Sequence, residues 1–242
     1  MVALGVGAYL VFAVATLPAS LVTSRLGPLG VMTAGVEGTV WKGRAQVVQV
    51  ANARLGSVSW DLHVLPMFTG RLQADVQLNR IDGFARGSVS VSPSGNLRVR
   101  DLAASLPLSA LPIAGLPRGW AGTLNAKLAH LEVEQGWPTK VEGTVEAADI
   151  VGPRSTANMG SYKATFPNPA AKADAGLSGI LTDTGGPVQF TGTLLLKPDR
   201  SYWIDGMVAT KPQTPGDVVR ALQFLGPPDA QGRRPFATDG VL

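Results

Sequence analysis

Two histidines, His63 and His130, carry the side chain that most often acts as a general base or a metal ligand. They lie far apart in the sequence, and each falls within or beside a predicted strand. Neither has another histidine or a carboxylate at a spacing typical of metal ligands. We therefore interpret both as residues of the surface or of a sheet edge.

The carboxylates do not form a catalytic pair either. Glu142 and Glu146 share one face of a predicted strand, which puts them about 13 Å apart, too far for general acid–base work on one bond. The segment from Asp183 to Gly186 is typical of a turn and lacks the pattern of a calcium loop. The chain has no phosphate-binding loop motif and no cysteine, so a thiol nucleophile is excluded. The sequence predicts a protein that is not an enzyme and uses no cofactor or metal.

Charge and composition narrow the class further. The net charge is +4, the charged residues are scattered, and Arg233-Arg234 is the one adjacent basic pair, which argues against a nucleic-acid binder. The 242 residues are 45% hydrophobic and include 29 glycines and 18 prolines, so many turns and few long helices are expected. This length suits one large all-β domain or two small ones.

Alternation of apolar and polar residues indicates a series of about ten to twelve strands. Arg71 to Asn79 shows it most clearly, with Leu72, Ala74, Val76 and Leu78 on one face. One polar, solvent-exposed face and one apolar face are typical of an antiparallel sheet that is covered on a single side. The other predicted strands begin at Val36 and cover 45–50, 57–62, 88–91, 97–100, 123–134, 140–149, 162–166, 177–181, 188–197 and 202–209.

Four breaks in this pattern are expected. A phase change within 123–134 predicts a bulge near Ala129-His130. Prolines rule out a long helix between Leu102 and Trp120, and a short helical turn is expected at 108–111. Asp217 to Leu225 is predicted to be a helix with Asp217 as its cap. The end, from 229 to 242, is either a last strand or a loose segment.

Glycines recur in the apolar row of several strands, at Gly38, Gly122, Gly143 and Gly192, and each of the four is followed by threonine and a branched apolar residue. A strand glycine usually marks a bend, a bulge or a close approach. Repeated on neighbouring strands, such bends predict a single, strongly curved antiparallel meander, an open barrel or groove around its apolar face. The simpler interpretation, that β-rich chains contain glycines, remains open.

The N-terminal run is apolar, and no charged side chain precedes Arg25. Three interpretations compete: a cleaved signal peptide, an uncleaved membrane anchor, and a buried helix. The length and uniformity of the run favour the anchor, although no basic residue precedes it as is usual for signal peptides and anchors. We predict an anchor at 1–24, a linker at 25–34 and a β-rich domain at 35–242.

The stretch from Gly35 to Gly43 resembles the protein N family of the bacterial type II secretion system. The residues that carry the resemblance are Gly35, Val36, Gly38, Thr39, Val40, Trp41, Gly43 and Ala45, preceded by Leu17-Pro18-Ala19-Ser20. Weaker matches follow in the family's order at 106–108, 141–145, 159–162 and 225–233. The similarity covers nearly the whole chain.

The resemblance implies an inner-membrane protein with a single anchor and a periplasmic β-rich domain, accessory to the export of folded proteins across the outer membrane. It implies other secretion components as partners, either the outer-membrane secretin or the inner-membrane platform, and a relation to AsmA-like proteins with curved sheets. The missing basic N-terminus departs from the family pattern.

Two functions from different classes follow. One is a scaffold that binds other components, for example by strand addition at a sheet edge. The alternative is a curved β-groove that binds or carries phospholipid, since a large bare apolar face needs a ligand or a partner. A third interpretation, an outer-membrane barrel, conflicts with the 6% aromatic content, because such barrels carry aromatic girdles. For Trp41, covering of the outer sheet face and contact with a partner are both open.

Overall fold

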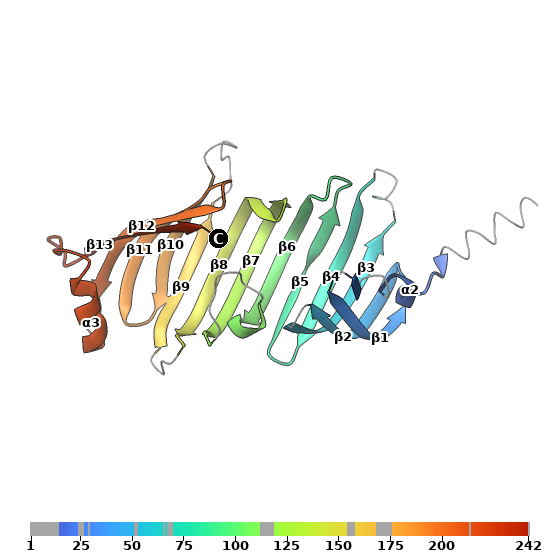
Figure 1. Ribbon diagram of the computed structural model, residues 1–242, viewed down its shortest axis with the longest axis horizontal. Helices are drawn as coiled ribbons and strands as arrows, with labels where there is room; N and C mark the ends of the chain where they lie inside the picture. The colour runs from blue at the N-terminus through green and yellow to red at the C-terminus, as the bar shows by residue number, and fades with distance from the viewer. Residues whose placement is uncertain are drawn as a thin grey trace, which may run out of the picture. The chain divides into compact units, whose positions relative to one another are not determined.

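The computed structural model describes residues 15–23, 27–28, 30–50, 53–64, 66, 70–111, 119–153, 158–167, 176–212 and 214–241 (Figure 1). Most of the predicted anchor at 1–24 lies outside these residues. Among the described residues, no helix has both the length and the apolar character needed to cross a membrane.

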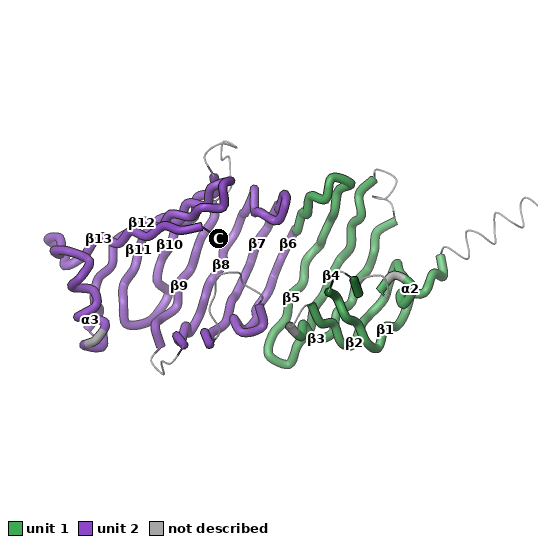
Figure 2. Tube along the Cα trace, in the orientation of Figure 1, with its two compact units in different colours: residues 1–99 green, residues 100–242 purple. Residues whose placement is uncertain are grey.

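The chain divides into two compact units, Met1–Val99 and Arg100–Leu242 (Figure 2). In the described residues, thirteen strands follow one another in sequence order from β1 to β13. The prediction of an all-β, antiparallel meander with few helices is confirmed in these terms. The thirteenth strand is the C-terminal segment that the sequence left undecided.

Unit 1 begins with the short helix α2 (Ala19–Thr23). Its strands are β1 (Val31–Gly38), β2 (Lys42–Val50), β3 (Ala53–His63), β4 (Leu72–Arg80) and β5 (Gly83–Val91), and β6 (Leu97–Pro107) starts here and runs into unit 2. Each strand from β1 to β4 pairs antiparallel with the next.

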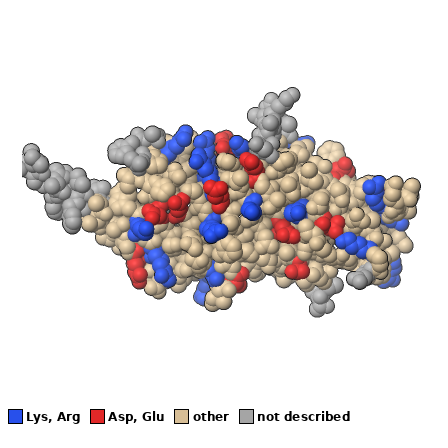
Figure 3. All heavy atoms as spheres, turned by 180° about the vertical axis from the view of Figure 1, so that it is seen from behind, with Lys and Arg blue, Asp and Glu red and all other residues tan. Residues whose placement is uncertain are grey.

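The register of unit 1 separates an apolar from a polar face. Trp60, Val76 and Gly87 lie opposite one another on β3, β4 and β5, in one row with the other apolar residues. The alternate row holds charged and hydroxyl side chains, such as Asp75 and Ser88. Figure 3 shows one face of the molecule on which Lys and Arg are intermixed with Asp and Glu.

Unit 2 contains the 3-10 turn η3 (Leu108–Ala110), the strands of the second meander and the helix α3 (Gly216–Gln223). Its strands are β7 (Ala121–Glu134), β8 (Trp137–Val151), β9 (Asn158–Phe166), β10 (Leu177–Gly185), β11 (Val188–Leu196), β12 (Ser201–Thr210) and β13 (Arg234–Val241). The predicted helical turn and the helix near 217 are both confirmed. Asp217 lies inside α3, and Pro215 occupies the N-cap position without a side-chain hydrogen bond, so the prediction of Asp217 as the cap was wrong.

The predicted bulge in β7 is confirmed by the register with β8. Leu128 pairs with Gly143 and His130 with Glu142, so Ala129 has no partner of its own. The extra residue returns Leu131 to the same face as Leu128, where both contribute to the apolar core. That core is centred on Leu128, Val141, Phe166 and Leu177.

The sheet of unit 2 curls toward its apolar face. The rings of Tyr162 on β9 and Phe190 on β11 have centroids 6.4 Å apart, and Phe190 and Phe236 on β13 are 5.8 Å apart. Alternate strands of a flat sheet are roughly 9.6 Å apart, and the three rings bridge that spacing on the apolar face. At the turns, Arg200 between β11 and β12 donates to the Gln135 carbonyl between β7 and β8, at 3.4 Å.

Candidate functional site

The Gly35–Gly43 stretch forms the hairpin between β1 and β2. The Thr39 N–H donates to the Lys42 carbonyl at 2.9 Å, and the Lys42 N–H donates to the Thr39 hydroxyl at 3.2 Å. Gly38 adopts a φ of +87°, and a Cβ placed there would lie 2.5 Å from the Lys42 carbonyl oxygen. Only glycine fits this position, because it combines a left-handed conformation with a close backbone contact.

Gly43 provides the space for a tryptophan of the next strand. A Cβ on Gly43 would lie 2.5 Å from a ring carbon of Trp60. The indole of Trp60 lies across this gap, and its Nε1–H donates to the Val40 carbonyl at 3.0 Å. The ring of Trp60 therefore fixes the hairpin tip, a role that the sequence pattern did not assign to it.

Trp41 lies in the turn itself and is half-buried. Its backbone carbonyl accepts a hydrogen bond from the Leu62 N–H on β3. The turn is thereby fastened to β3 by the Trp41 carbonyl as well as by the Trp60 indole. Whether the Trp41 side chain has a partner outside this chain stays a prediction.

The hairpin tip also holds the segment that follows the N-terminal apolar run. The Val40 N–H donates to the Leu17 carbonyl at 2.9 Å, and Pro18 forms an isolated antiparallel bridge with Thr39. Ala19 is only 1% exposed, whereas the Leu17 and Leu21 side chains are exposed. We refer to residues 17–21 on this hairpin as the strap. It joins the start of α2 to the tip of the first hairpin.

The four glycines predicted for a groove face occupy three different settings. Gly38 is a turn residue, as described above. Gly122 and Gly143 have φ values of +135° and +129° and lie at or opposite register shifts between β7 and β8, so they shape bulges. Gly192 faces Gly206 on β12, and a Cβ on it would lie 3.0 Å from the Phe190 ring.

Aromatic rings cover other strand glycines in the same way. A Cβ on Gly179 would lie 2.8 Å from the Phe166 ring, and one on Gly240 would lie 2.8 Å from the Tyr202 ring. Together with Gly43 and Trp60, these pairs follow one scheme, in which a glycine on one strand accommodates an aromatic ring from the neighbouring strand. The space left by the absent side chains is therefore filled by the protein's own rings at these positions.

An ion pair joins β10 to the segment between β12 and α3 in unit 2. The Lys211 ammonium contacts the Asp183 carboxylate, whose other oxygen accepts the Phe190 N–H at 2.9 Å. Burial opposes ionisation of Asp183, but the bonds from Lys211 and Phe190 outweigh it and hold its pKa below the ordinary value. Burial, with the nearby charge of Asp183, raises the pKa of the Tyr162 hydroxyl.

Asp183→Asn is expected to lower the free energy of unfolding at pH 7 by roughly 2 kcal/mol, because the partly buried Lys211 ammonium loses its partner. The folded-state pKa lies below the unfolded one, so the carboxylate stabilises the fold above the ordinary Asp pKa. That contribution is lost as the pH falls through the folded pKa. Urea unfolding measured from pH 7 down to about pH 3 should show that the difference in free energy of unfolding between the variant and the wild type becomes smaller as the pH falls. A difference that stays constant over this range, or one matched by Asp101→Asn, would contradict the assignment.

The 225–233 segment, one of the weaker family matches, forms a loop organised by Asp229. One carboxylate oxygen accepts the N–H groups of Gln231 and Arg233 at 2.9 and 2.8 Å, and the other accepts from the Arg233 guanidinium. The backbone bond from Arg233, followed by its side-chain bond, holds the pKa of Asp229 below the ordinary value. The loop connects α3 to β13.

The side chains considered for chemistry are placed in separate cross-strand contacts. His63 contacts Asp75 at 3.2 Å, and His130 contacts Glu142 at 3.2 Å. Glu146 accepts a hydrogen bond from the Thr184 hydroxyl at 2.6 Å. Within the described ranges, no three histidine or carboxylate side chains gather as a metal site would require.

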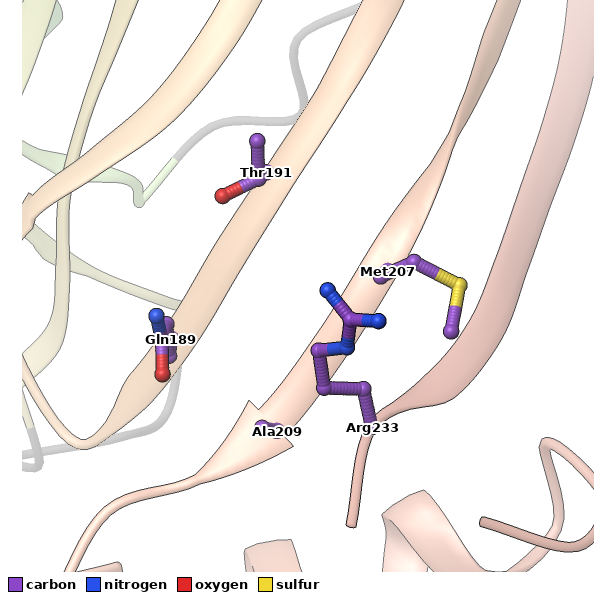
Figure 4. Close-up of a pocket in the computed structure, with 5 residues that line it drawn as sticks. All are labelled: Gln189, Thr191, Met207, Ala209 and Arg233. Atoms are coloured by element: carbon purple, nitrogen blue, oxygen red, sulfur yellow. The ribbon is translucent and has the colours of Figure 1, made fainter. Parts of the chain in front are cut away.

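Two hollows lie beside β12. One, of about 100 Å³, is lined by Gln189, Thr191, Met207, Ala209 and Arg233 on the outer face of the sheet (Figure 4). The other, of about 170 Å³, lies between β12 and the apolar side of α3, where Val219 and Leu222 face Val208. Both are below the roughly 300 Å³ at which ligand pockets usually begin.

Comparisons of the amino-acid sequence relate this chain to known proteins. The family described as type II secretion system, protein N matches residues 30–237. Type II secretion system protein N of Vibrio cholerae serotype O1 is 28% identical over 240 residues, which cover 93% of this chain and 91% of the relative. The protein of the same name from Aeromonas hydrophila is 29% identical over 244 residues, covering 97% and 95%. No solved structure matches the chain.

Proposed function

The chain belongs to the type II secretion system protein N family, and we propose that it serves this machine as a scaffold anchored in the inner membrane with its β-rich domain in the periplasm. The family is one of accessory secretion components and is not known as an enzyme family. Its members work within a secretion system, so other components of that system are the partners to expect.

The strap is the observation that carries the scaffold proposal. The chain leaves the N-terminal apolar run at Leu17 and is bonded at once to Val40 at the hairpin tip. The bridge from Pro18 to Thr39 and the burial of Ala19 hold this junction to the sheet. If the apolar run crosses the membrane, the first hairpin is fixed close to the membrane surface. A sheet held in this way suits a part that connects the membrane to other components.

The alternative, a lipid-binding groove, has support from the apolar face of unit 1. Leu72 and Val91 lie opposite each other on β4 and β5 and both remain exposed. In unit 2, however, aromatic rings occupy the space over Gly179, Gly192 and Gly240. Of these positions, Gly192 is one that the sequence suggested for a groove face, and the space over it is occupied by the Phe190 ring, which favours the scaffold.

A secretion assay with a topology control tests the proposal. In a bacterium with a type II secretion system, deletion of the gene is expected to leave a secreted enzyme in the periplasm, and the full chain should restore export. A version whose first 16 residues are replaced by a cleavable signal peptide should restore it poorly. A C-terminal alkaline phosphatase fusion should be active, as in the periplasm.

Two results would contradict the anchored scaffold: full complementation by the cleavable version, or an inactive phosphatase fusion with normal secretion. Organic extracts of the purified full chain, analysed by mass spectrometry, decide the alternative. Phospholipid at near one molecule per chain would favour the groove over the scaffold.

A further inference from the structure

The outer face of β10–β13, opposite the face that carries Phe190 and Phe236, has an apolar patch. Trp203 on β12 is 51% exposed, Ile180 on β10 is 50% exposed and Val241 on β13 is 76% exposed. The register places Leu195 on β11 and Asp239 on β13 on either side of Trp203. We define the Trp203 patch as Ile180, Leu195, Trp203, Asp205, Asp239 and Val241. It reaches the border of the sheet, because β13 is the last strand in the order.

Two carboxylates flank the tryptophan without a cation. Asp205 lies two residues after Trp203 on the same face of β12. Asp239 on β13 is the cross-strand partner of Trp203. Both side chains are exposed, and neither forms an ion pair with any described residue. Like charges on neighbouring strands repel each other, so a cation brought to this place would be bound favourably.

Two cations lie in the turn that precedes β12. Lys197 and Arg200 lie in the turn between β11 and β12, together with Asp199. The Arg200 guanidinium donates to the Gln135 carbonyl at 3.4 Å, and among the described residues neither Arg200 nor Lys197 forms an ion pair with the two aspartates. The Trp203 patch as defined contains two carboxylates and no cation, although the chain carries a net charge of +4.

We propose that the Trp203 patch binds a protein segment that presents arginine or lysine beside an apolar side chain. The cation lies over the indole face of Trp203, where cation–π attraction acts, and bonds to Asp205 and Asp239. The neighbouring apolar side chain packs on Leu195 and Ile180. Tryptophan and arginine are enriched among the residues that contribute most of the binding energy at protein interfaces. The proposal deepens the scaffold function and takes its cellular meaning from it.

Other occupants fit less well. An anionic membrane surface would be repelled by the two carboxylates. A divalent cation would find two carboxylates only, since the described residues hold no group of three possible ligands. The partner is therefore a basic protein segment, and vesicles serve as a comparison in the test.

The experiment measures binding of two capped six-residue peptides to the purified full chain in detergent, by calorimetry. One alternates arginine and valine, and the other alternates glutamate and valine. The arginine peptide is expected to bind at least about tenfold more tightly. Trp203→Ala and the double change Asp205→Asn with Asp239→Asn should each weaken it about tenfold. Asp101→Asn, which removes one negative charge elsewhere in the chain, should leave affinity within about twofold.

Equal affinity for both peptides, or unchanged affinity in the patch variants, would overturn the proposal. So would binding of phosphatidylglycerol vesicles that depends on Trp203. Matching melting temperatures show that the variants fold, as expected for exposed positions. Because the assay requires no secretion, its failure leaves the anchored scaffold untouched, and a failed secretion assay leaves the peptide result standing.

Discussion

Phe166→Ala is expected to lower the free energy of unfolding by about 3–5 kcal/mol, the largest effect of any single change considered. Phe166 is 7% exposed and lies in the core with Leu128, Val141 and Leu177. Its ring also covers Gly179, which has no side chain to move into the vacated space. Urea unfolding followed by circular dichroism gives the difference, with Phe224→Ala as the matched control because Phe224 is 91% exposed.

A second change separates this explanation from a general loss of apolar surface. Gly179→Ala in the wild-type chain should destabilise, since its Cβ would lie 2.8 Å from the Phe166 ring. In the Phe166→Ala background the same change should restore part of the lost stability by occupying the cavity. Additive effects of the two changes would show that the ring and the glycine are not coupled.

Gly43→Ala is expected to lower the free energy of unfolding by roughly 2–3 kcal/mol and to disturb the strap. The added methyl group would meet the Trp60 ring at 2.5 Å and the Thr39 carbonyl oxygen at 2.9 Å. Displacing the indole breaks its hydrogen bond to the Val40 carbonyl, on the residue whose N–H holds Leu17. Chemical unfolding, with tryptophan fluorescence as a second signal, measures the loss.

Gly185→Ala is the control, because a Cβ on this strand glycine meets nothing within 4 Å. It should leave both stability and export near wild type. If Gly43→Ala behaved like Gly185→Ala, the indole would not fix the hairpin. If Gly43→Ala lost stability while export stayed normal at a temperature where it is folded, the strap would have no part in the function.

Local patterns in the sequence were sufficient to predict where most of the strands lie. Alternation with period two marks each strand from β2 to β12, and the phase change in β7 located the bulge at Ala129 to within a residue. β13 was left open because the segment from Asp229 to Leu242 is polar at first and apolar only briefly at its end. The helix cap was misassigned because Pro215 already fixes a backbone suitable for the start of α3, which requires no side-chain cap.

What the sequence could not provide depends on register. The pairing of Gly43 with Trp60 or Gly179 with Phe166 follows from which residues face each other across strands, and the lengths of intervening turns decide that. Without the register, glycines in an apolar row indicate vacant space. In the structure Gly192 lies against an aromatic ring, whereas Gly38, Gly122 and Gly143 lie against backbone atoms. The strap uses backbone groups of Leu17 and Val40, which any residue type provides, so composition gives no signal for it.

The order of the strands has a consequence for biogenesis. Because strands follow the sequence from β1 to β13, each new strand finds its partner in the strand made just before it. Assembly can therefore proceed from the N-terminal end as the polypeptide emerges, without waiting for a distant segment to close the structure. Throughout that growth the newest strand has one side unpaired, open to capture by a chaperone or by another nascent chain until the next strand arrives.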